Sequence, residues 1–538
     1  MRTVYKPRLG AAPDVSQAEL PSDYWSTASD YRFRNGRAEI VKGFVEAAEP
    51  ESELGQRNNF AYHLVYTVAN ADLVNNGGAS EDIFITVGYE AIYCTRPTTD
   101  QWVRIDESDW LVDFGDNNGI KSNLISSAVL NGVPFLAASG NSVGTPYYWL
   151  RDVASGFQPY TDGVNWPTGA YVDGAIVAAK YHLFCIGMRG PNEFNENTVL
   201  WSSATEPGGI PETFIAAPDN DAGFVALADT PGGFVDGLQV GEFTYLCKHN
   251  SIYTAQYIGG QSIFSFRLRH SNVGVISKHC LQAINNRLFL VTDSDVGFTD
   301  GTNFESVANS RVRDLLFNNL SDPDGVFTVH YADKSEVWIY WPSESGGMAN
   351  NVLIYNYQED TWGQTDVDPA LHARMGSWPW TLLLKAEASL GDQVTAVTPD
   401  NTNADASGNL CRLHIADTSQ TVSKPSGGIA PHVKRFRLPI VPDDPQRLVL
   451  LRRVGVLATR QWHGTDIQAN DVLIYLRVTN TREDEDTDAL TYTWKLSESD
   501  NYAVKPEYGR YFDIEVWSTQ RNLAIDGFYL DWVPGGEF

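Results

Sequence analysis

The sequence predicts a mainly β protein: a β-propeller of about six or seven blades, an N-terminal arm, and a small C-terminal β-sandwich-like domain. The chain has 538 residues, more than one hydrophobic core usually organises, so two or three domains are expected. Its 15 Trp, 25 Tyr, 24 Phe and 45 Gly residues favour short strands and tight turns over helices. A repeat of strands in the middle of the chain then favours a propeller over a two-sheet sandwich.

Each repeat has an apolar strand, a turn rich in Gly, Asn or Asp, a second strand, and an aromatic residue after a polar turn. Six aromatic residues mark successive units at intervals of 40 to 58 residues: Trp102, Phe157, Phe214, Phe264, Phe304 and Trp362. A more degenerate unit runs from Thr381 to Ser419. Propeller blades repeat at roughly 40 to 50 residues, whereas strands of a two-sheet sandwich, the alternative, recur every ~8 to 12 residues without a longer period.

Three parts of the chain follow from this pattern. Residues 1–50 are expected as an arm with a hairpin at Asn35-Gly36, residues 51–425 as the propeller-like repeat, and residues 430–538 as a C-terminal β domain. The linker Ser423 to Gly428 separates the last two parts. Five strands are expected in the C-terminal domain, with sequences RLVLLRRVGVLAT, DVLIYLRVTN, TYTWKLS, RYFDIEVWS and IDGFYLDWVP.

The stretch from Asn286 to Leu320 shows the local plan most clearly. Apolar runs broken by Asp-Ser-Asp and Asp-Gly predict successive strands joined by tight turns. The period then changes, because Val312, Leu315, Leu316 and Leu320 fall on one helical face. We therefore expect a short helix over Ser310 to Leu320, capped by Ser310.

The net charge of -28 argues against a general nucleic-acid or anionic-membrane binding surface, since both need excess Lys and Arg. Two segments differ: Met1 to Phe44 has a net charge of +2 and His432 to Arg453 a net charge of +4. We expect them to make assembly contacts, with Arg435, Arg437, Arg452 and Arg453 at the surface.

Five scattered cysteines without CxxC spacing indicate small core residues of a chain assembled in reducing cytoplasm: Cys94, Cys185, Cys247, Cys280 and Cys411. The N-terminus has no apolar signal core, and no apolar run approaches membrane-spanning length. Stable membrane insertion is therefore not expected.

Motifs for chemistry are weak. Gly140 to Gly144 matches the GxSxG pattern around Ser142, but a strand rather than a helix follows it. The pairs Asp219/Asp221, Asp293/Asp295 and Asp322/Asp324 begin like calcium loops without the Glu at the twelfth position. His463 is interpreted as a packing residue. We assign no catalytic, cofactor-binding or metal-binding residue, expect no cofactor, and do not expect an enzyme.

A resemblance supplies a function. The stretch NRLFLVTDSDVGFTDGTNFESV…SRVRDLLFNNL and the later NNVLIYNYQEDTWGQ, from Asn350 to Gln364, resemble tail nozzle proteins of short-tailed bacteriophages. The opening W…YRFRNGRAE…GF and the ending GRYFDIEVWST…LAIDGFYLDWVPGG resemble the same family. The resemblance thus reaches both ends of the chain.

The resemblance implies a virion structural protein of the phage tail, assembled in the host cytoplasm. It implies a homo-oligomeric ring of six subunits below an adaptor ring, with tail fibres or tailspikes at its side and a plug or needle at its tip. Such a nozzle extends the DNA channel, helps retain the packaged genome, and lets double-stranded DNA pass without specific binding.

Two other function classes stay open from the residues alone. One is a carbohydrate- or receptor-binding propeller of a phage tail, with Trp102, Trp362 and Trp380 stacking on sugars at loop tips. The other is a propeller glycosidase with a carboxylate pair in a central pocket, which spacing cannot identify among 67 acidic residues.

Overall fold

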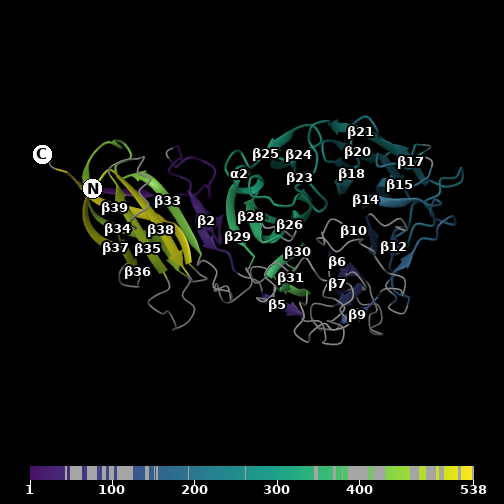
Figure 1. Cartoon of the computed structure of the whole chain (residues 1–538), viewed down its shortest axis with the longest axis horizontal. Coiled ribbons are helices and arrows are strands. Elements are labelled where there is room, and N and C mark those ends of the chain that lie inside the picture. The colour runs from purple at the N-terminus through teal and green to yellow at the C-terminus, as the bar shows by residue number, and fades with distance from the viewer. Residues whose placement is uncertain are drawn as a thin grey trace.

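The protein is mainly β and consists of a propeller beside a two-sheet domain (Figure 1). The computed structural model describes residues 1–17, 19–42, 45–48, 63–69, 81–87, 92–95, 102–105, 125–139, 145–150, 152, 155–191, 193–260, 262–343, 349–367, 371–377, 380–385, 411–415, 431–460, 472–479, 492–495, 502–518 and 523–535. No helix in these ranges is long and apolar enough to cross a membrane.

The described strands between residues 45 and 415 form seven four-stranded antiparallel units, one of which continues into a larger sheet. The first four blades are β6 (His63–Ala69), β7 (Glu81–Val87), β8 (Ile92–Thr95) and β9 (Trp102–Arg104); β10 (Ile125–Leu130), β11 (Val133–Ala138), β12 (Tyr147–Tyr148) and β13 (Gln158–Pro159); β14 (Tyr171–Ala179), β15 (His182–Arg189), β16 (Thr198–Trp201) and β17 (Gly223–Ala226); and β18 (Phe234–Val240), β19 (Phe243–Lys248), β20 (Ile252–Tyr257) and β21 (Phe264–His270). The remaining blades are β22 (Leu281–Ile284), β23 (Arg287–Val291), β24 (Val296–Thr299) and β25 (Phe304–Ser306); β26 (Phe327–Tyr331), β27 (Glu336–Trp341), β28 (Asn351–Asn356) and β29 (Thr361–Asp366); and β30 (Leu371–Ser377), β31 (Trp380–Lys385), β32 (Cys411–Ile415) and β5 (Val45–Ala48).

The blades close into a ring. Their innermost strands β6, β10, β14, β18, β22, β26 and β30 contact one another in this order, and β30 contacts β6 in turn. The outermost strand of the seventh blade, β5, comes from the N-terminal side and pairs antiparallel with β32, with Val45 opposite Ile415. Because early and late strands share one blade, the ring is held shut by sheet hydrogen bonds, and the propeller prediction is confirmed.

Five of the six predicted aromatic markers lie in or next to the outermost strand of their blade, whereas Phe214 lies in the connection from β16 to β17. Trp102, Phe264 and Phe304 begin β9, β21 and β25, and Trp362 lies in β29. The degenerate unit from Thr381 to Ser419 contains β31 and β32 of the seventh blade. The turns of the fifth blade are also as predicted, since Asp300 accepts hydrogen bonds from the amides of Thr302 and Asn303.

The helix predicted over Ser310 to Leu320 is shorter and is capped differently. Helix α2 covers Arg313–Phe317, while Ser310 has a φ of 60° and does not cap it. The expected inward face is correct, because Val312 and Leu316 are buried. Two 3-10 turns follow, η2 (Pro323–Gly325) and η3 (Ala332–Lys334).

Two further sheets build the second domain. The sixth blade continues into one of them, in the order β26-β27-β28-β29-β3-β4-β39-β34-β37, and β1 also pairs with β39. The second sheet has the order β2-β33-β38-β35-β36. The bounds of these strands are β1 (Arg2–Tyr5), β2 (Thr27–Ser29), β3 (Tyr31–Arg34), β4 (Arg37–Ile40), β33 (His432–Pro439), β34 (Val449–Arg460), β35 (Val472–Thr479), β36 (Tyr492–Lys495), β37 (Tyr502–Gly509), β38 (Tyr511–Ser518) and β39 (Leu523–Pro534).

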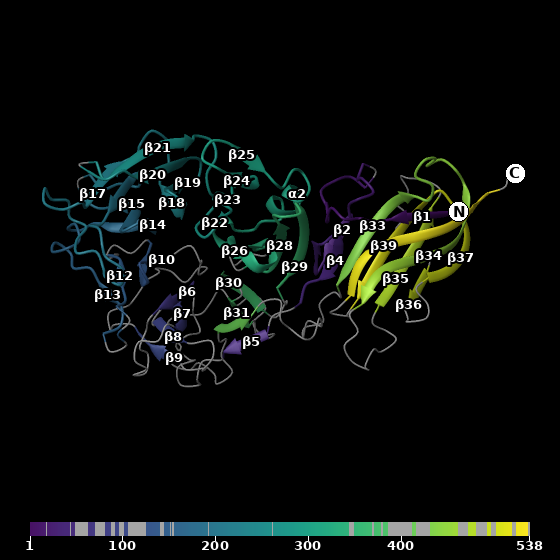
Figure 2. The same ribbon diagram turned by 180° about the vertical axis from the view of Figure 1, so that it is seen from behind.

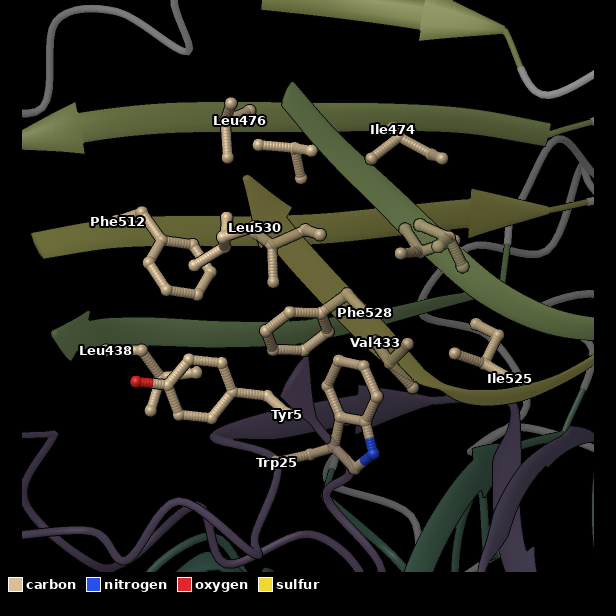
Figure 3. Packing of buried hydrophobic residues seen from close by; sticks show 14 of the residues in the cluster. Tyr5, Trp25, Val433, Leu438, Ile474, Leu476, Phe512, Ile525, Phe528 and Leu530 are labelled. Carbon is tan, nitrogen blue, oxygen red and sulfur yellow. The ribbon is translucent and has the colours of Figure 1, made fainter. Parts of the chain in front are cut away.

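The two sheets share one apolar core and therefore form a β-sandwich. Figure 3 shows Tyr5 and Trp25 from the N-terminal segment packed against Phe528 and Phe512 from the C-terminal strands. The ring of Tyr5 lies 5.7 Å from that of Phe512 and 5.6 Å from that of Phe528, and Trp25 is fully buried. The N-terminal segment is thus part of the sandwich core.

The N-terminal segment, expected as an arm, forms the predicted Asn35-Gly36 hairpin and also supplies strands to both sheets. Each of the five strands predicted for the C-terminal domain corresponds to a strand, and β33 and β37 were missed. Strand β33 lacks apolar alternation because one inward position is Arg435, which is 1% exposed. That arginine was expected at the surface, and this expectation is wrong.

Candidate functional site: the junction of propeller and sandwich

The propeller and the sandwich are joined through one continuous sheet. Strand β29 of the sixth blade pairs with β3 of the sandwich through Gln364 and Tyr31. Two side chains of β29 flank this pairing: Thr361 Oγ1 donates to the Phe33 carbonyl at 2.9 Å and Thr365 Oγ1 to Asp30 Oδ1 at 2.7 Å. A Cβ at position 363 would lie 2.4 Å from the Tyr31 carbonyl oxygen, so a glycine is needed there.

The β3–β4 turn also binds the sixth blade. The amides of Asn35 and Gly36 donate to the two carboxylate oxygens of Glu359 at 2.7 and 3.3 Å. Both turn residues have positive φ, as a two-residue hairpin requires. The turn therefore connects β3 to β4 and also places its two amides where they bind the Glu359 carboxylate.

A buried ion pair lies under the same junction. Arg32 Nη1 lies 3.5 Å from Glu336 Oε2, and their side chains are 6% and 0% exposed. Trp338 Nε1 donates to the same carboxylate oxygen at 2.9 Å. Because Arg32 belongs to β3 and Glu336 to β27, this charge pair links the two domains.

Asp14 links the N-terminal segment to α2. Its two carboxylate oxygens accept the amides of Asp314 and Leu315 at 2.6 and 2.9 Å, which satisfies two free N–H groups at the helix N-terminus. The Asp14 amide donates to the Arg311 carbonyl at 3.1 Å. Arg311 in turn donates to Asp360 Oδ1 at 2.8 Å, and Asp360 is the residue immediately before β29. The predicted cap, Ser310, is replaced by an acid 300 residues away in the chain.

A second polar cluster ties the inner strands of the propeller together. It is centred on the segment Ser277 to His279, which precedes β22, the inner strand of the fifth blade. Lys278 Nζ donates to Ser139 Oγ after β11, and Ser139 Oγ donates to the Gly174 carbonyl of β14. The cluster therefore reaches blades two and three from blade five.

His279 extends the cluster to two more blades. Its amide donates to Asp236 Oδ2 of β18 at 2.8 Å, and its carbonyl accepts the Thr328 amide of β26 at 2.8 Å. Burial raises the pKa of the Asp236 carboxyl. Burial lowers the pKa of Lys278 to about 8, although the Asp236 charge opposes this change. A buried lysine near a carboxylate is a candidate for chemistry, but here its ammonium group donates to the Ser139 hydroxyl.

A cavity of about 310 Å³ lies between the fifth and sixth blades. Phe298 and Tyr355, which line it, are almost fully buried. Arg287 lies over the Phe298 ring and pairs with Glu305. The cavity is polar at its rim and apolar at its base.

The residues weighed for chemistry in the sequence take structural roles where they are described. Asp221 accepts the Ala204 amide, Asp322 accepts the Asp324 amide, and Asp295 pairs with Arg313. Among the described residues, no group of three or more His, Cys, Asp or Glu side chains could hold a metal ion. Ser142 and His463 lie outside the described residues.

Other sequence expectations are corrected or confirmed by burial. Trp362 was expected at an exposed loop tip but is fully buried, with Nε1 donating to the Val307 carbonyl at 3.0 Å. Arg437 is also mostly buried and lies 3.8 Å from Asp513. Four cysteines are buried core residues, as predicted: Cys94, Cys185, Cys247 and Cys280.

Sequence reasoning missed the Asp14 cap, the Arg32–Glu336 pair and the Lys278 cluster. Lys278 and His279 lie between the mostly apolar segments Val273 to Ile276 and Cys280 to Ile284, and this position is a signal that could have indicated the last of these. The first two depend on contacts between distant parts of the chain.

These features define a seven-bladed β-propeller joined rigidly to a β-sandwich. No protein-family model matches the chain, and no curated protein matches it either. Among solved structures, the crystal structure of a nidogen/laminin complex has 8% identity and a TM-score of 0.28, and covers 56% of this chain and 93% of its own. The AfRom2 CNH domain has 9% identity and a TM-score of 0.34, and covers 66% of this chain and 96% of its own.

Replacing Asp14 with Ala should lower the free energy of unfolding by about 0.5 to 2 kcal/mol, the usual value of a helix cap. Hydrogen exchange of the Asp314 and Leu315 amides should become faster, because both lose their acceptor. Urea denaturation and amide exchange would measure these changes. Glu19→Ala, an exposed acid of the same segment, serves as the control. Unchanged exchange at both amides would contradict the assigned role.

Replacing Lys278 with Met should destabilise the protein at pH 7 by about 1 to 3 kcal/mol, because it removes the hydrogen bond to Ser139 Oγ and a positive charge near the buried Asp236 carboxyl. The loss should be smaller at pH 5, since burial raises the pKa of Asp236 and brings it closer to protonation. The double variant Lys278→Met, Asp236→Asn should recover most of it.

The pH dependence of the wild-type free energy of unfolding gives an independent test of the buried Lys278 charge. Lys278 has a pKa of about 8 in the folded chain against an ordinary value of 10.5, so the unfolded chain holds more protons between these values. This lysine should therefore add stability as the pH rises from about 8 to 10.5. Equal pH dependence in wild type and Lys278→Met, measured by chemical denaturation, would be inconsistent with a buried ammonium group.

Proposed function

We propose that this chain is a virion structural protein that forms the nozzle of a short bacteriophage tail. In this role it extends the DNA channel below an adaptor ring, helps retain the packaged genome, and then lets it leave. A ring of six copies, a plug or needle at the tip, and tail fibres or tailspikes at the side are the partners that this function requires.

One observation carries the proposal. The separate stretches that resemble nozzle proteins meet in one structural unit. Asn286 to Leu320 contains β23, β24 and β25 of the fifth blade and α2, and Asn350 to Gln364 contains β28 and most of β29. The opening stretch contains β3 and β4, and the ending contains β38 and β39. Strands β29, β3, β4 and β39 are consecutive in the large sheet. If the resemblance came from turn sequences alone, the matching stretches would not be expected to form consecutive strands of one sheet.

The physical character of the junction suits a load-bearing role. A sheet that runs from the propeller into the sandwich transmits force through backbone hydrogen bonds rather than through a linker. The Arg32–Glu336 pair and the Asp14 contact cross the same boundary. A subunit that must hold a pressurised genome benefits from such rigidity.

A glycan-binding propeller is the second candidate function. The cavity between blades five and six favours it, because charged groups at its rim and aromatic residues at its base are typical of small-ligand pockets. Its volume of about 310 Å³ is near the lower limit of such pockets. Glycan-array binding by the isolated chain would favour this function over the nozzle.

The nozzle proposal predicts that purified virions contain this chain at the tail, in six copies. Quantitative mass spectrometry and electron cryo-microscopy of particles would measure this. Particles assembled without the chain should fill with DNA and then lose it, and supplying the chain in trans should restore retention. Absence of the chain from mature particles would refute the proposal.

The assembled ring should also show negligible affinity for duplex DNA at physiological salt. Its net charge of -28 per chain repels phosphates, and each Lys or Arg that bound one would add friction to a moving genome. We expect a bore lined largely by Asp, Glu, Asn, Ser and Gly. Binding measured on purified rings from about 50 to 200 mM salt is the test. Tight binding with a steep salt dependence would overturn the low-friction channel but not the nozzle itself.

A further inference from the structure

The outward face of the large sandwich sheet is formed by β1, β39, β34 and β37. Side chains along each of these strands point alternately toward the core and away from it. Val449, Val454 and Leu530 are buried, so the residues that alternate with them point away from the core. Two rows cross the face. One row is Val4, Tyr529, Gly455 and Tyr502, and the next is Arg2, Asp531, Arg453 and Val504.

Apolar side chains gather on and beside this face. Val504 is 65% exposed, Tyr508 50%, Val4 47% and Leu448 43%. Single exposed apolar residues are ordinary, but Val504 and Tyr508 of β37, Val4 of β1 and Leu448 just before β34 lie on or beside one face of the sheet, and such a group is typical of an interaction surface. Strand β37 is also the edge of its sheet.

Two arginine–tyrosine pairs occupy the centre of the face. The Arg2 guanidinium lies 4.4 Å from the Tyr529 ring centre, and Arg453 lies 5.0 Å from that of Tyr502. A Cβ at Gly455 would lie 2.3 Å from the Tyr529 ring, so the glycine lets this ring lie across the strand. Arg and Tyr are enriched in the parts of interfaces that contribute most to binding.

The charge of the face indicates its occupant. Arg2, Arg452 and Arg453 are exposed on it. Asp531 is the one acid in the two rows, and it already accepts two hydrogen bonds from Arg2, so the uncompensated positive charge comes from Arg452 and Arg453. Two such faces would repel each other, so a two-fold contact is disfavoured. An acidic surface is required, and this chain, with its net charge of -28, supplies one.

The acidic counterpart lies in the third blade and the start of the fourth. Nine acidic residues and no Lys or Arg occur between Gly190 and Cys247. Glu206, Glu212 and Asp219, in the connection from β16 to β17, are exposed. Figures 1 and 2 show β17 at one end of the long axis and β37 at the other. The two surfaces therefore lie at opposite ends of the chain, as a head-to-tail contact requires.

We propose that the outward face of β1, β39, β34 and β37 docks on the acidic third blade of a second copy of this chain. The contact is heterologous, so repetition of it produces a closed ring or an open chain. The inference rests on the proposed nozzle function for its biological role, but not for its geometry. It assigns the self-association surface of the ring to named residues.

The area of the surface predicts the strength of the contact. Four strands spaced about 4.8 Å apart and about 20 Å long give roughly 400 Å² in projection, about half of what each partner buries in a standard interface. A single contact should therefore be weak, and association should depend on concentration. Salt should weaken it further, because opposite charges meet at the surface.

The test uses full-length chains with one surface changed at a time. Val504→Glu places an acid in the basic face, and Glu212→Lys with Asp219→Lys reverses the acidic blade. All three positions are exposed, so folding should be retained and circular dichroism should match wild type. Leu9→Glu is the matched control, because Leu9 is 40% exposed and lies in the N-terminal segment, where its amide donates to the Asp23 carbonyl, outside both surfaces.

Mass photometry and sedimentation should show concentration-dependent self-association of wild type and of Leu9→Glu. Each surface variant alone should lose association by at least tenfold. A mixture of Val504→Glu with the Glu212→Lys, Asp219→Lys variant should form a dimer and nothing larger, because one intact basic face then meets one intact acidic blade.

Wild-type chains that stay monomeric up to high concentration, or a Val504→Glu chain that associates like wild type, would overturn the surface. These outcomes are separable from the nozzle test. If virions contain the chain and the Val504→Glu variant still associates like wild type, only the surface assignment is wrong. Virions can lack the chain while the mixture still dimerises, in which case only the nozzle proposal falls.

Discussion

The close approach of β3 to β29 is the constraint on which the rest of the architecture depends. It requires that residue 363 have no side chain, because a Cβ there would meet the Tyr31 carbonyl oxygen at 2.4 Å. Once the strands meet, the sixth blade and the sandwich share one sheet. The Asn35-Gly36 turn then reaches Glu359, and Arg32 reaches Glu336. Each of these contacts presupposes the others, so the two domains form one mechanical unit.

The polar groups of the interior follow a common rule. Arg435 donates to the carbonyls of Leu20 and Pro21, and Lys278 donates to Ser139, so each buried cation holds together segments that have no sheet hydrogen bonds between them. Burying a charge is costly, and the cost is offset only when its donors are satisfied. In both places the charge binds residues outside the strands: Leu20 and Pro21 in the N-terminal segment, and Ser139 after β11.

Much of the fold could be predicted because its signals are local. The spacing of aromatic residues such as Phe264 and Phe304 reports one blade at a time, and Asn35-Gly36 specifies its own hairpin. The pairing of β5 with β32 and of β1 with β39 could not be predicted, since no local period records a partner hundreds of residues away. Arg435 was misplaced for the same reason. Its acceptors, the carbonyls of Leu20 and Pro21, precede it by more than four hundred residues.

The shared sandwich has a consequence for biosynthesis. Strand β4 ends at Ile40 and β33, the first sandwich strand after the propeller, begins at His432. At about 5 to 20 residues per second, a ribosome needs roughly 20 to 80 seconds to add the intervening chain. During that interval Trp25 and Tyr5 have no core to enter, and β1, β2 and β4 have no partner strands from the C-terminal domain. The nascent N-terminus must remain soluble while the propeller is made, and its excess of basic residues helps to keep it so.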